Sequence, residues 1–206
     1  MKDPETLRQG IETLGIELDE DTQARLLAYL ELLRRWNRKI RLVGDADRPD
    51  AVDIILVDSL APLLAVDARV SKIVDIGSGA GLPGVLLAIA RPDIAITTLE
   101  PIHKKHAFQR TARRELDLNN LEPRCERIED HPGDRIYDLA VSRATFAPAE
   151  WIERGRALVG ANGRVVAMTN RSEDVPEECR AISYQVAGRT RVLAVRDRAD
   201  DGSTLR

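Results

Sequence analysis

The stretch that decides the fold is Ile73-Val74-Asp75-Ile76-Gly77-Ser78-Gly79-Ala80-Gly81-Leu82-Pro83-Gly84. An apolar run ends in a cluster of glycines, and a helix is expected to begin near Pro83 because proline suits the first helical position. Glycine lets the backbone reverse tightly and approach a ligand closely. At the carboxyl end of a first parallel strand, such a turn predicts a ligand-binding loop.

The residues around this turn exclude two common phosphate-binding loops. A Walker loop needs Lys and then Ser or Thr after Gly84, where Val85 and Leu86 stand. The dinucleotide fingerprint needs a glycine at the position of Leu82. The remaining Asp-x-Gly-x-Gly-x-Gly pattern favours a nucleoside without a pyrophosphate, and we predict that it is contacted from Asp75, Ser78, Gly79 and Gly81.

The chain around the turn predicts an α/β fold. Strand-like runs occupy Lys72–Ile76, Ala95–Leu99, Glu122–Arg127, Asp138–Ser142, Arg164–Met168, Ala181–Ala187 and Thr190–Arg196. Helix-like runs between the earlier strands occupy Pro83–Ala90, Lys104–Leu116 and Pro148–Leu158. This alternation predicts a mostly parallel sheet with helices on both faces. The last two runs are joined by a short turn at Gly188, which predicts an antiparallel hairpin.

Residues 1–70 predict a helical extension, and residues 71–206 the sheet domain. Apolar residues recur at helical spacing over Asp21–Ile40, with Asp19 or Asp21 as the N-cap, and a second apolar helix is expected over Ala51–Ala65. The end of the first helix carries a basic patch that suits phosphate: Arg34, Arg35, Arg38, Lys39 and Arg41. Basic residues at a helix C-terminus also favour its dipole, so a purely structural interpretation stays open.

Composition limits the function further. The 206 residues carry 31 Lys and Arg against 34 Asp and Glu, so nucleic acid must be bound through a local patch. An aromatic content of 3% is too low for single-strand binding mainly by stacking. Cys125 and Cys179 form no zinc motif, and His103 and His106 lack a third ligand nearby, so no metal is expected. The N-terminus lacks an apolar signal segment, which predicts a cytoplasmic protein without membrane contact.

Acidic and apolar residues after the next two strands predict how a nucleoside is held. Glu100 ends the second strand, 21 residues after Gly79, where a carboxylate accepts hydrogen bonds from ribose hydroxyls. Its removal is then expected to weaken binding and to leave the stability of the free protein nearly unchanged. The alternative is a solvated carboxylate at the end of a strand. After the third strand, an adenine fits against Ile128 with Glu129 as its polar partner.

Several motifs along the chain match one known family. They are Leu14-Gly15-Ile16-Glu17-Leu18, Arg35-Trp36-Asn37, Val57-Asp58-Ser59-Leu60, the glycine turn with its Gly-Leu-Pro-Gly extension, Lys104-Lys105 and Ser142-Arg143-Ala144. Over roughly residues 10–170 the chain resembles the bacterial glucose-inhibited division protein B family, the small-subunit ribosomal RNA guanine-N7 methyltransferases.

The resemblance implies a class I methyltransferase fold, Rossmann-like, with a seven-stranded sheet and a helical N-terminal extension. It implies S-adenosyl-L-methionine as cofactor, contacting Gly77, Leu82, Glu100, Ile128 and Glu129. It places Arg143 in the active site, as the catalytic and cofactor-facing arginine, although a surface arginine remains the alternative. The partner would be the small ribosomal subunit, bound by a monomer through the basic patch together with Lys104 and Lys105.

The chain departs from the family pattern at three places on the expected acceptor side. Arg41-Leu42-Val43 replaces Asn-Leu-Thr, Ile54 and Ile55 replace an Arg-His pair, and Thr169 replaces a lysine. Two alternatives therefore stand beside ribosomal RNA methylation. One is a divergent methyltransferase for another RNA, a protein or a small molecule, and the other is a non-catalytic RNA-binding relative.

Overall fold

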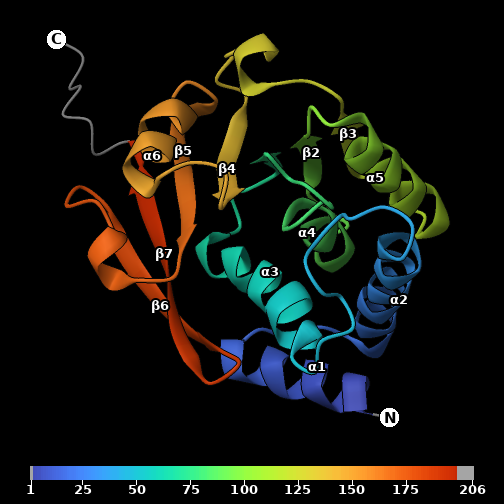
Figure 1. The fold of residues 1–206 in the computed structure, drawn as a ribbon. Coiled ribbons are helices and arrows are strands. Elements are labelled where there is room, and N and C mark those ends of the chain that lie inside the picture. The colour runs from blue at the N-terminus through green and yellow to red at the C-terminus, as the bar shows by residue number, and fades with distance from the viewer. Residues whose placement is uncertain (1, 199–206) are drawn as a thin grey trace, which may run out of the picture.

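The computed structural model describes residues 2–198 and contains a seven-stranded sheet at its centre (Figure 1). The strand order is β3-β2-β1-β4-β5-β7-β6. Strands β1 to β5 pair in parallel, and β7 pairs antiparallel with β5 and β6. The strands are β1 (Lys72–Ile76), β2 (Ala95–Leu99), β3 (Leu121–Arg124), β4 (Tyr137–Arg143), β5 (Val159–Thr169), β6 (Arg180–Val186) and β7 (Arg189–Asp197).

These bounds confirm the predicted topology and correct two strand ends. The β3 strand ends at Arg124, earlier than predicted, because the chain then leaves the sheet toward a short 3-10 helix, η3 (Ile128–Asp130). The β5 strand begins at Val159 instead of Arg164, since Tyr137 pairs with Val159 before the register shifts.

Helices cover both faces of the sheet, as the alternation predicts. The helices between strands are α4 (Gly84–Ala90), α5 (His103–Glu115) and α6 (Pro148–Gly155). One hydrophobic core joins α4, α5 and the N-terminal helices to one face of the sheet, and a smaller core holds α6 against the other. Successive residues of β1 alternate between them, because Ile73 faces the larger core and Val74 the smaller.

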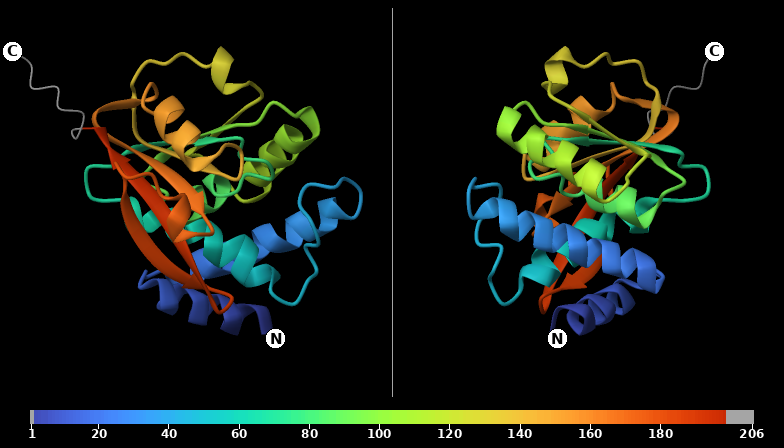
Figure 2. Two further views of the ribbon diagram at one scale, coloured as in Figure 1. Left: turned by 60° about the vertical axis from the view of Figure 1, so that its left-hand side comes forward. Right: turned by 90° about the vertical axis from the view of Figure 1, so that its right-hand side faces the viewer.

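The N-terminal helices form one layer on the sheet, which the two views of Figure 2 show. They are α1 (Lys2–Leu14), α2 (Glu20–Asn37), the π-helical η1 (Val52–Val57), α3 (Asp58–Leu60) and the 3-10 helix η2 (Ala61–Ala65). The expected helix over Ala51–Ala65 is thus present in three joined parts. A charged segment after β5 contains the short η4 (Ser172–Asp174).

The ends of α2 follow from side-chain hydrogen bonds. Asp19 is the N-cap, because its carboxylate accepts from the Thr22 N–H at 2.7 Å. The helix stops at Asn37, before the predicted Ile40. The Asn37 side chain accepts from the backbone N–H groups of Leu42 and Val43 and turns the chain away.

The extension and the sheet share a continuous core. Tyr29 on α2 is fully buried, and its hydroxyl donates to the Ala80 carbonyl in the glycine turn at 2.7 Å. Arg164 on β5 donates to the Ala65 carbonyl at 2.7 Å. Residues 1–70 therefore act as a layer of the same fold, and their separation as a domain stays a prediction. Among the described residues, no helix is long and apolar enough to cross a membrane.

Candidate active site

The glycine turn follows β1 and rests on the end of β2. The backbone N–H groups of Gly77 and Ser78 both donate to the Leu99 carbonyl, at 2.9 and 3.1 Å. Gly77, Gly79 and Gly81 have φ angles of 67°, 58° and 84°, in the left-handed region that favours glycine. The chain thus reverses at the carboxyl edge of the sheet, where the sequence places it.

The three glycines meet different surroundings. A Cβ atom on Gly77 would lie 2.2 Å from the Thr145 hydroxyl, and one on Gly81 would lie 2.1 Å from a Val85 methyl. A Cβ on Gly79 would meet nothing within 4 Å. Close packing inside the protein therefore requires Gly77 and Gly81, while Gly79 faces open space, as expected where a ligand approaches the backbone.

A buried amide holds the turn from behind. The Gln109 side chain on α5 donates to the Ser78 hydroxyl and the Gly79 carbonyl, each at 2.8 Å, and accepts from the Thr98 hydroxyl at 2.6 Å. Ser78 is itself buried and its hydroxyl accepts from Gln109 within the protein interior, and its predicted contact with a ligand stays a prediction. Gln109 was not among the residues predicted from the sequence. The available signal was an amide beside Phe108 on the apolar face of α5.

Asp75 is a buried carboxylate with one free oxygen. Its Oδ2 accepts from the Gly84 N–H at 2.7 Å, which anchors the start of α4, while Oδ1 has no hydrogen-bond partner. Burial raises the pKa of Asp75 to about 7, although the Gly84 N–H and the charge of Arg143 act in the opposite direction. A buried acceptor without a partner fits a site that a cationic ligand or water completes.

Glu100 makes hydrogen bonds within the protein, in addition to its predicted contact with a ligand. Its side chain accepts from the Gly79 N–H and the Ile102 N–H, each at 2.8 Å, and the residue is 3% exposed. The alternative of a solvated carboxylate is therefore wrong. Removing Glu100 would also leave both N–H groups without their acceptor, which gives a physical reason to expect that the free protein loses stability.

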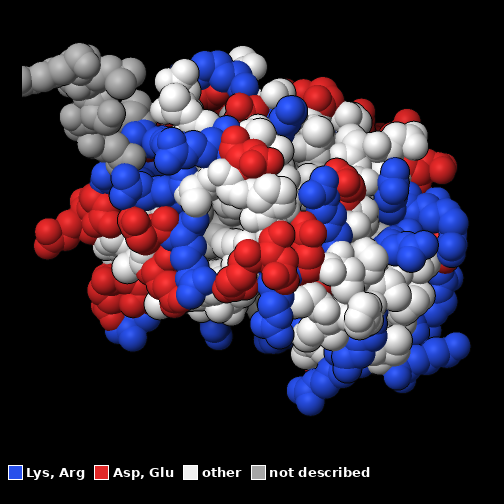
Figure 3. Space-filling model, turned by 90° about the horizontal axis from the view of Figure 1, so that it is seen from above, with Lys and Arg blue, Asp and Glu red and all other residues white. Residues whose placement is uncertain are grey.

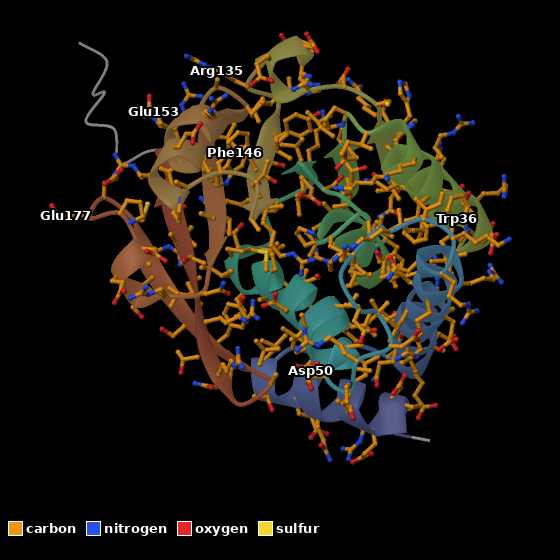
Figure 4. The ribbon with its side chains drawn as sticks, viewed as in Figure 1. Trp36, Asp50, Arg135, Phe146, Glu153 and Glu177 are labelled. Carbon is orange, nitrogen blue, oxygen red and sulfur yellow. The ribbon has the colours of Figure 1, made fainter. Side chains whose placement is uncertain are left out.

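Beside the turn lies a first cavity, of about 190 Å³. Its lining includes the predicted residues Gly77, Ile128 and Glu129, together with Leu99 and Phe146. Phe146 stacks on Trp151 of α6 at 6.0 Å between ring centroids, on the inner side of α6 in Figure 4. The first cavity thus combines apolar side chains with three charged ones, Glu126, Arg127 and Glu129, and its apolar part suits a purine base.

On the other side of the turn lies a second cavity, of about 290 Å³. Its lining includes Leu82 from the turn and Arg143 from the end of β4. Four of the residues that depart from the family pattern also line it, namely Val43, Ile54, Ile55 and Thr169. Arg41 does not. The glycine turn therefore separates the two cavities, since Gly77 belongs to one and Leu82 to the other.

An ionic cluster holds Arg143 at the second cavity. Arg143 Nη1 donates to the Ser59 hydroxyl at 3.0 Å and lies 3.4 Å from the buried Asp58 carboxylate. Asp58 also accepts from the Tyr184 hydroxyl at 2.8 Å and pairs with Arg191 at 3.1 Å. Two guanidinium groups thus share one carboxylate, which leaves positive charge facing the cavity and excludes a free surface role for Arg143.

From the sequence, Asp58 and Ser59 were recognised only as part of a motif, and Tyr184 and Arg191 were not predicted at all. No local signal marks these last two residues, because β6 and β7 reach Asp58 from 126 and 133 positions away.

The predicted basic patch divides into two groups. Arg34 pairs with Asp3 at 2.8 Å and Glu31 at 2.7 Å, so it ties α1 to α2. Arg35 pairs with Glu115 of α5 at 2.7 Å. Arg38, Lys39, Arg41 and Lys104 are exposed and Lys105 is half-buried, and none of the five has an ion pair within residues 2–198. These five remain available for an external anion.

The described part of the chain holds no group of three or more side chains suited to a metal ion. His103 and His106 have separate neighbours. His103 Nδ1 lies 3.3 Å from the Cys125 sulfur, and His106 Nε2 lies 3.2 Å from the Pro123 carbonyl.

Comparison with known proteins gives one family. Residues 22–198 match the model of GidB, rRNA small subunit methyltransferase G. The chain is 37% identical over 181 residues to ribosomal RNA small subunit methyltransferase G of Methylobacillus flagellatus, covering 88% of this chain and 86% of that protein. It is 41% identical over 165 residues to the protein of the same name from Chromohalobacter salexigens, covering 80% of this chain and 78% of the other.

A solved structure supports the fold. A methyltransferase from Geobacter sulfurreducens aligns with a TM-score of 0.60 at 17% identity, covering 92% of this chain and 97% of that one. The fold likeness, the family model and the identities over most of both sequences agree, and the chain belongs to the rRNA small subunit methyltransferase G family.

Proposed function

We propose that the protein transfers a methyl group from S-adenosyl-L-methionine to N7 of a guanine in small-subunit ribosomal RNA. The observation that carries this proposal is the glycine turn between two cavities, in a chain of this family. One cavity offers apolar walls for an adenine. The other offers Arg143 and Arg191 for an anionic acceptor.

The residues present fit the proposed cofactor. The open space at Gly79 admits a ligand against the backbone, and Ile128 with Glu129 would hold the adenine. The unpartnered oxygen of Asp75 would accept a hydrogen bond from the ammonium group, directly or through water, and Glu100 would accept from the ribose. When bound, S-adenosyl-L-methionine supplies an electrophilic methyl group on a sulfonium.

The chain's own contribution to the reaction is positioning. Guanine N7 carries a free lone pair, so no side chain has to remove a proton before the methyl group is transferred. Arg143, fixed by Ser59 and Asp58, has the planar donor geometry that suits guanine O6 or a flanking phosphate. Holding the two reactants in line and excluding water lowers the barrier. The buried carboxylate of the second cavity, Asp58, is engaged by Arg143, Arg191 and Tyr184, which fits a role in positioning Arg143.

The RNA would also contact the exposed basic residues beside the site. Arg38, Lys39 and Arg41 precede Val43, which lines the second cavity, and Lys104 and Lys105 follow Pro101, which lines the first. Large exposed apolar side chains in the described range are confined to Ile102 and Ile136, which favours a monomer. A ribosomal substrate would be met in the cytoplasm, which supports the predicted localisation.

The test is methyl transfer from radiolabelled S-adenosyl-L-methionine to purified small ribosomal subunits that lack the endogenous modification. We expect label in the ribosomal RNA and, after digestion to nucleosides, in 7-methylguanosine. Arg143→Gln should lose most of the turnover. Label on another RNA, a protein or a metabolite from cell extract would instead support a divergent acceptor, which the apolar Ile54 and Ile55 would explain. Cofactor binding without transfer to any acceptor would support a non-catalytic protein.

A further inference from the structure

A third hollow lies on the outer face of α5, apart from both cavities of the site. It measures about 600 Å³ and is open to solvent, and Arg110, Arg113 and Arg114 lie along it. None of its lining residues also lines the first or second cavity. We call it the arginine groove.

The arginine groove carries an excess of positive charge. All three arginines are exposed, and none of them has an ion pair within the described part of the chain. Asp117 is the one carboxylate among the lining residues. Arg113 and Arg114 lie three and four residues after Arg110, so each of them shares a helix face with Arg110, and all three line the same hollow. The whole chain has a net charge of −3, so this concentration of cations is local.

The arginine groove is continuous with the basic end of α2. Trp36 of α2 packs edge-on against Phe108 of α5 at 5.6 Å between ring centroids, and Arg35 pairs with Glu115. Figure 4 shows Trp36 between these two helices, and Figure 2 shows the helices side by side. In Figure 3, Lys and Arg side chains gather along the right-hand edge, on the side where Figure 1 places α2 and α5. Exposed cations therefore lie on two neighbouring helices, at the C-terminal end of α2 and along α5.

We propose that the arginine groove binds backbone phosphates of the RNA that flanks the methylated base. The inference rests on the proposed function and adds a second docking surface to it. Arginine suits this ligand because its planar fork donates two hydrogen bonds to one phosphate. Contacts to phosphates fix the register of a nucleic acid on a protein and carry no sequence information. The groove would thus hold the subunit in place while the second cavity receives the base.

The test is the triple variant Arg110→Gln, Arg113→Gln, Arg114→Gln, measured for binding to radiolabelled small-subunit RNA and for methylation of subunits. Each lost phosphate contact lowers the log–log salt slope of binding by about 0.7 to 0.9, so three lower it by about 2 to 3. We expect this change, a KM for subunits raised about tenfold at moderate salt, and an unchanged kcat. Thermal stability and affinity for S-adenosylhomocysteine should equal those of the wild type.

A matched control removes the same charge elsewhere. Lys72 on β1, Arg189 on β7 and Arg135 in the loop before β4 are also exposed, and their joint replacement by Gln should leave the salt slope of the wild type unchanged. Equal slopes for the two triple variants would overturn the proposal. Displacement of the RNA by polyglutamate as readily as by polyphosphate of equal charge would also overturn it, in favour of an acidic protein partner.

The binding measurement needs no turnover, so it separates the two proposals. If the wild type methylates no ribosomal RNA but the arginine groove variant still binds RNA with the reduced slope, the proposed function fails and the groove stands. If the wild type methylates subunits and the variant matches it in KM and slope, the groove fails alone.

Discussion

Replacing Glu100 by alanine tests how the protein prepares its nucleoside site. The carboxylate accepts two backbone hydrogen bonds, from Gly79 and Ile102, each at 2.8 Å, in a residue that is 3% exposed. A hydrogen bond to a charged group contributes about 1.5–3 kcal/mol, and a buried N–H left without an acceptor costs about 1–3 kcal/mol. Water entering the vacated space recovers part of this. We therefore expect the ligand-free protein to lose about 3 kcal/mol of unfolding free energy.

For a protein of this size that loss lowers Tm by roughly 6–12 °C. Urea unfolding without ligand measures it directly. Glu100→Gln keeps one acceptor oxygen and should lie between wild type and Glu100→Ala. The control is Glu122→Ala, because Glu122 is an exposed strand carboxylate whose pair with Arg124 lies at 3.0 Å in solvent, and its loss should cost under about 1 kcal/mol.

Calorimetry with S-adenosylhomocysteine, at a temperature where every variant is folded, measures the ribose contact separately. Binding should weaken by about tenfold or more, since a charged acceptor is lost. Ligand-free stability within about 0.5 kcal/mol of wild type would refute the structural role of Glu100. Unchanged affinity in a destabilised variant would refute its role as ribose ligand.

Three further predictions concern the turn and the basic surface. Gly79→Ala should lower cofactor affinity at least about tenfold while the protein stays folded, because the new methyl group, at a φ of 58°, enters the open space that the cofactor would occupy. Unchanged calorimetric affinity would contradict the assignment of Gly79 to the cofactor site. Burial raises the pKa of Asp75 to about 7, so between about pH 4 and 7 the folded protein holds a proton that the unfolded chain has lost. Ligand-free stability should therefore fall as pH rises through this window, by up to about 1.4 kcal/mol per unit, and Asp75→Asn should remove that contribution in urea titrations. Replacing Arg38, Lys39 and Arg41 by Ala should lower the salt slope of RNA binding by about 2–3 and leave cofactor affinity intact; an unchanged slope would exclude them as phosphate contacts.

Local patterns predicted the parts of the fold that depend on local physics. The alternation of strand-like and helix-like runs predicted a mostly parallel sheet, and β1 and β2 have the predicted bounds. The Asp19 cap and the positive φ angles of the glycine turn follow from side-chain and backbone preferences at single positions.

The contacts that could not be predicted from the sequence join residues that are far apart in the chain. Arg34 belongs to a basic run in the sequence, yet in the fold it pairs with Asp3, 31 residues away. The Asp58 cluster needs Tyr184 and Arg191 from strands far along the chain. Glu100 has the predicted spacing for a ribose ligand, but only the three-dimensional turn shows that it also binds Gly79.

The hydrogen bond from Tyr29 to Ala80 fixes the distance between two parts of the protein. Tyr29 lies on the helix that leads to Arg38, Lys39 and Arg41, and Ala80 lies in the turn beside the transfer point. The bond is buried, so it ties the helix before the proposed RNA contacts directly to the glycine turn of the proposed transfer site. A docked strand would then present the base that lies at the right distance from its bound backbone. The enzyme would then select its target base first by the distance of that base from the bound RNA backbone, and only second by the RNA sequence.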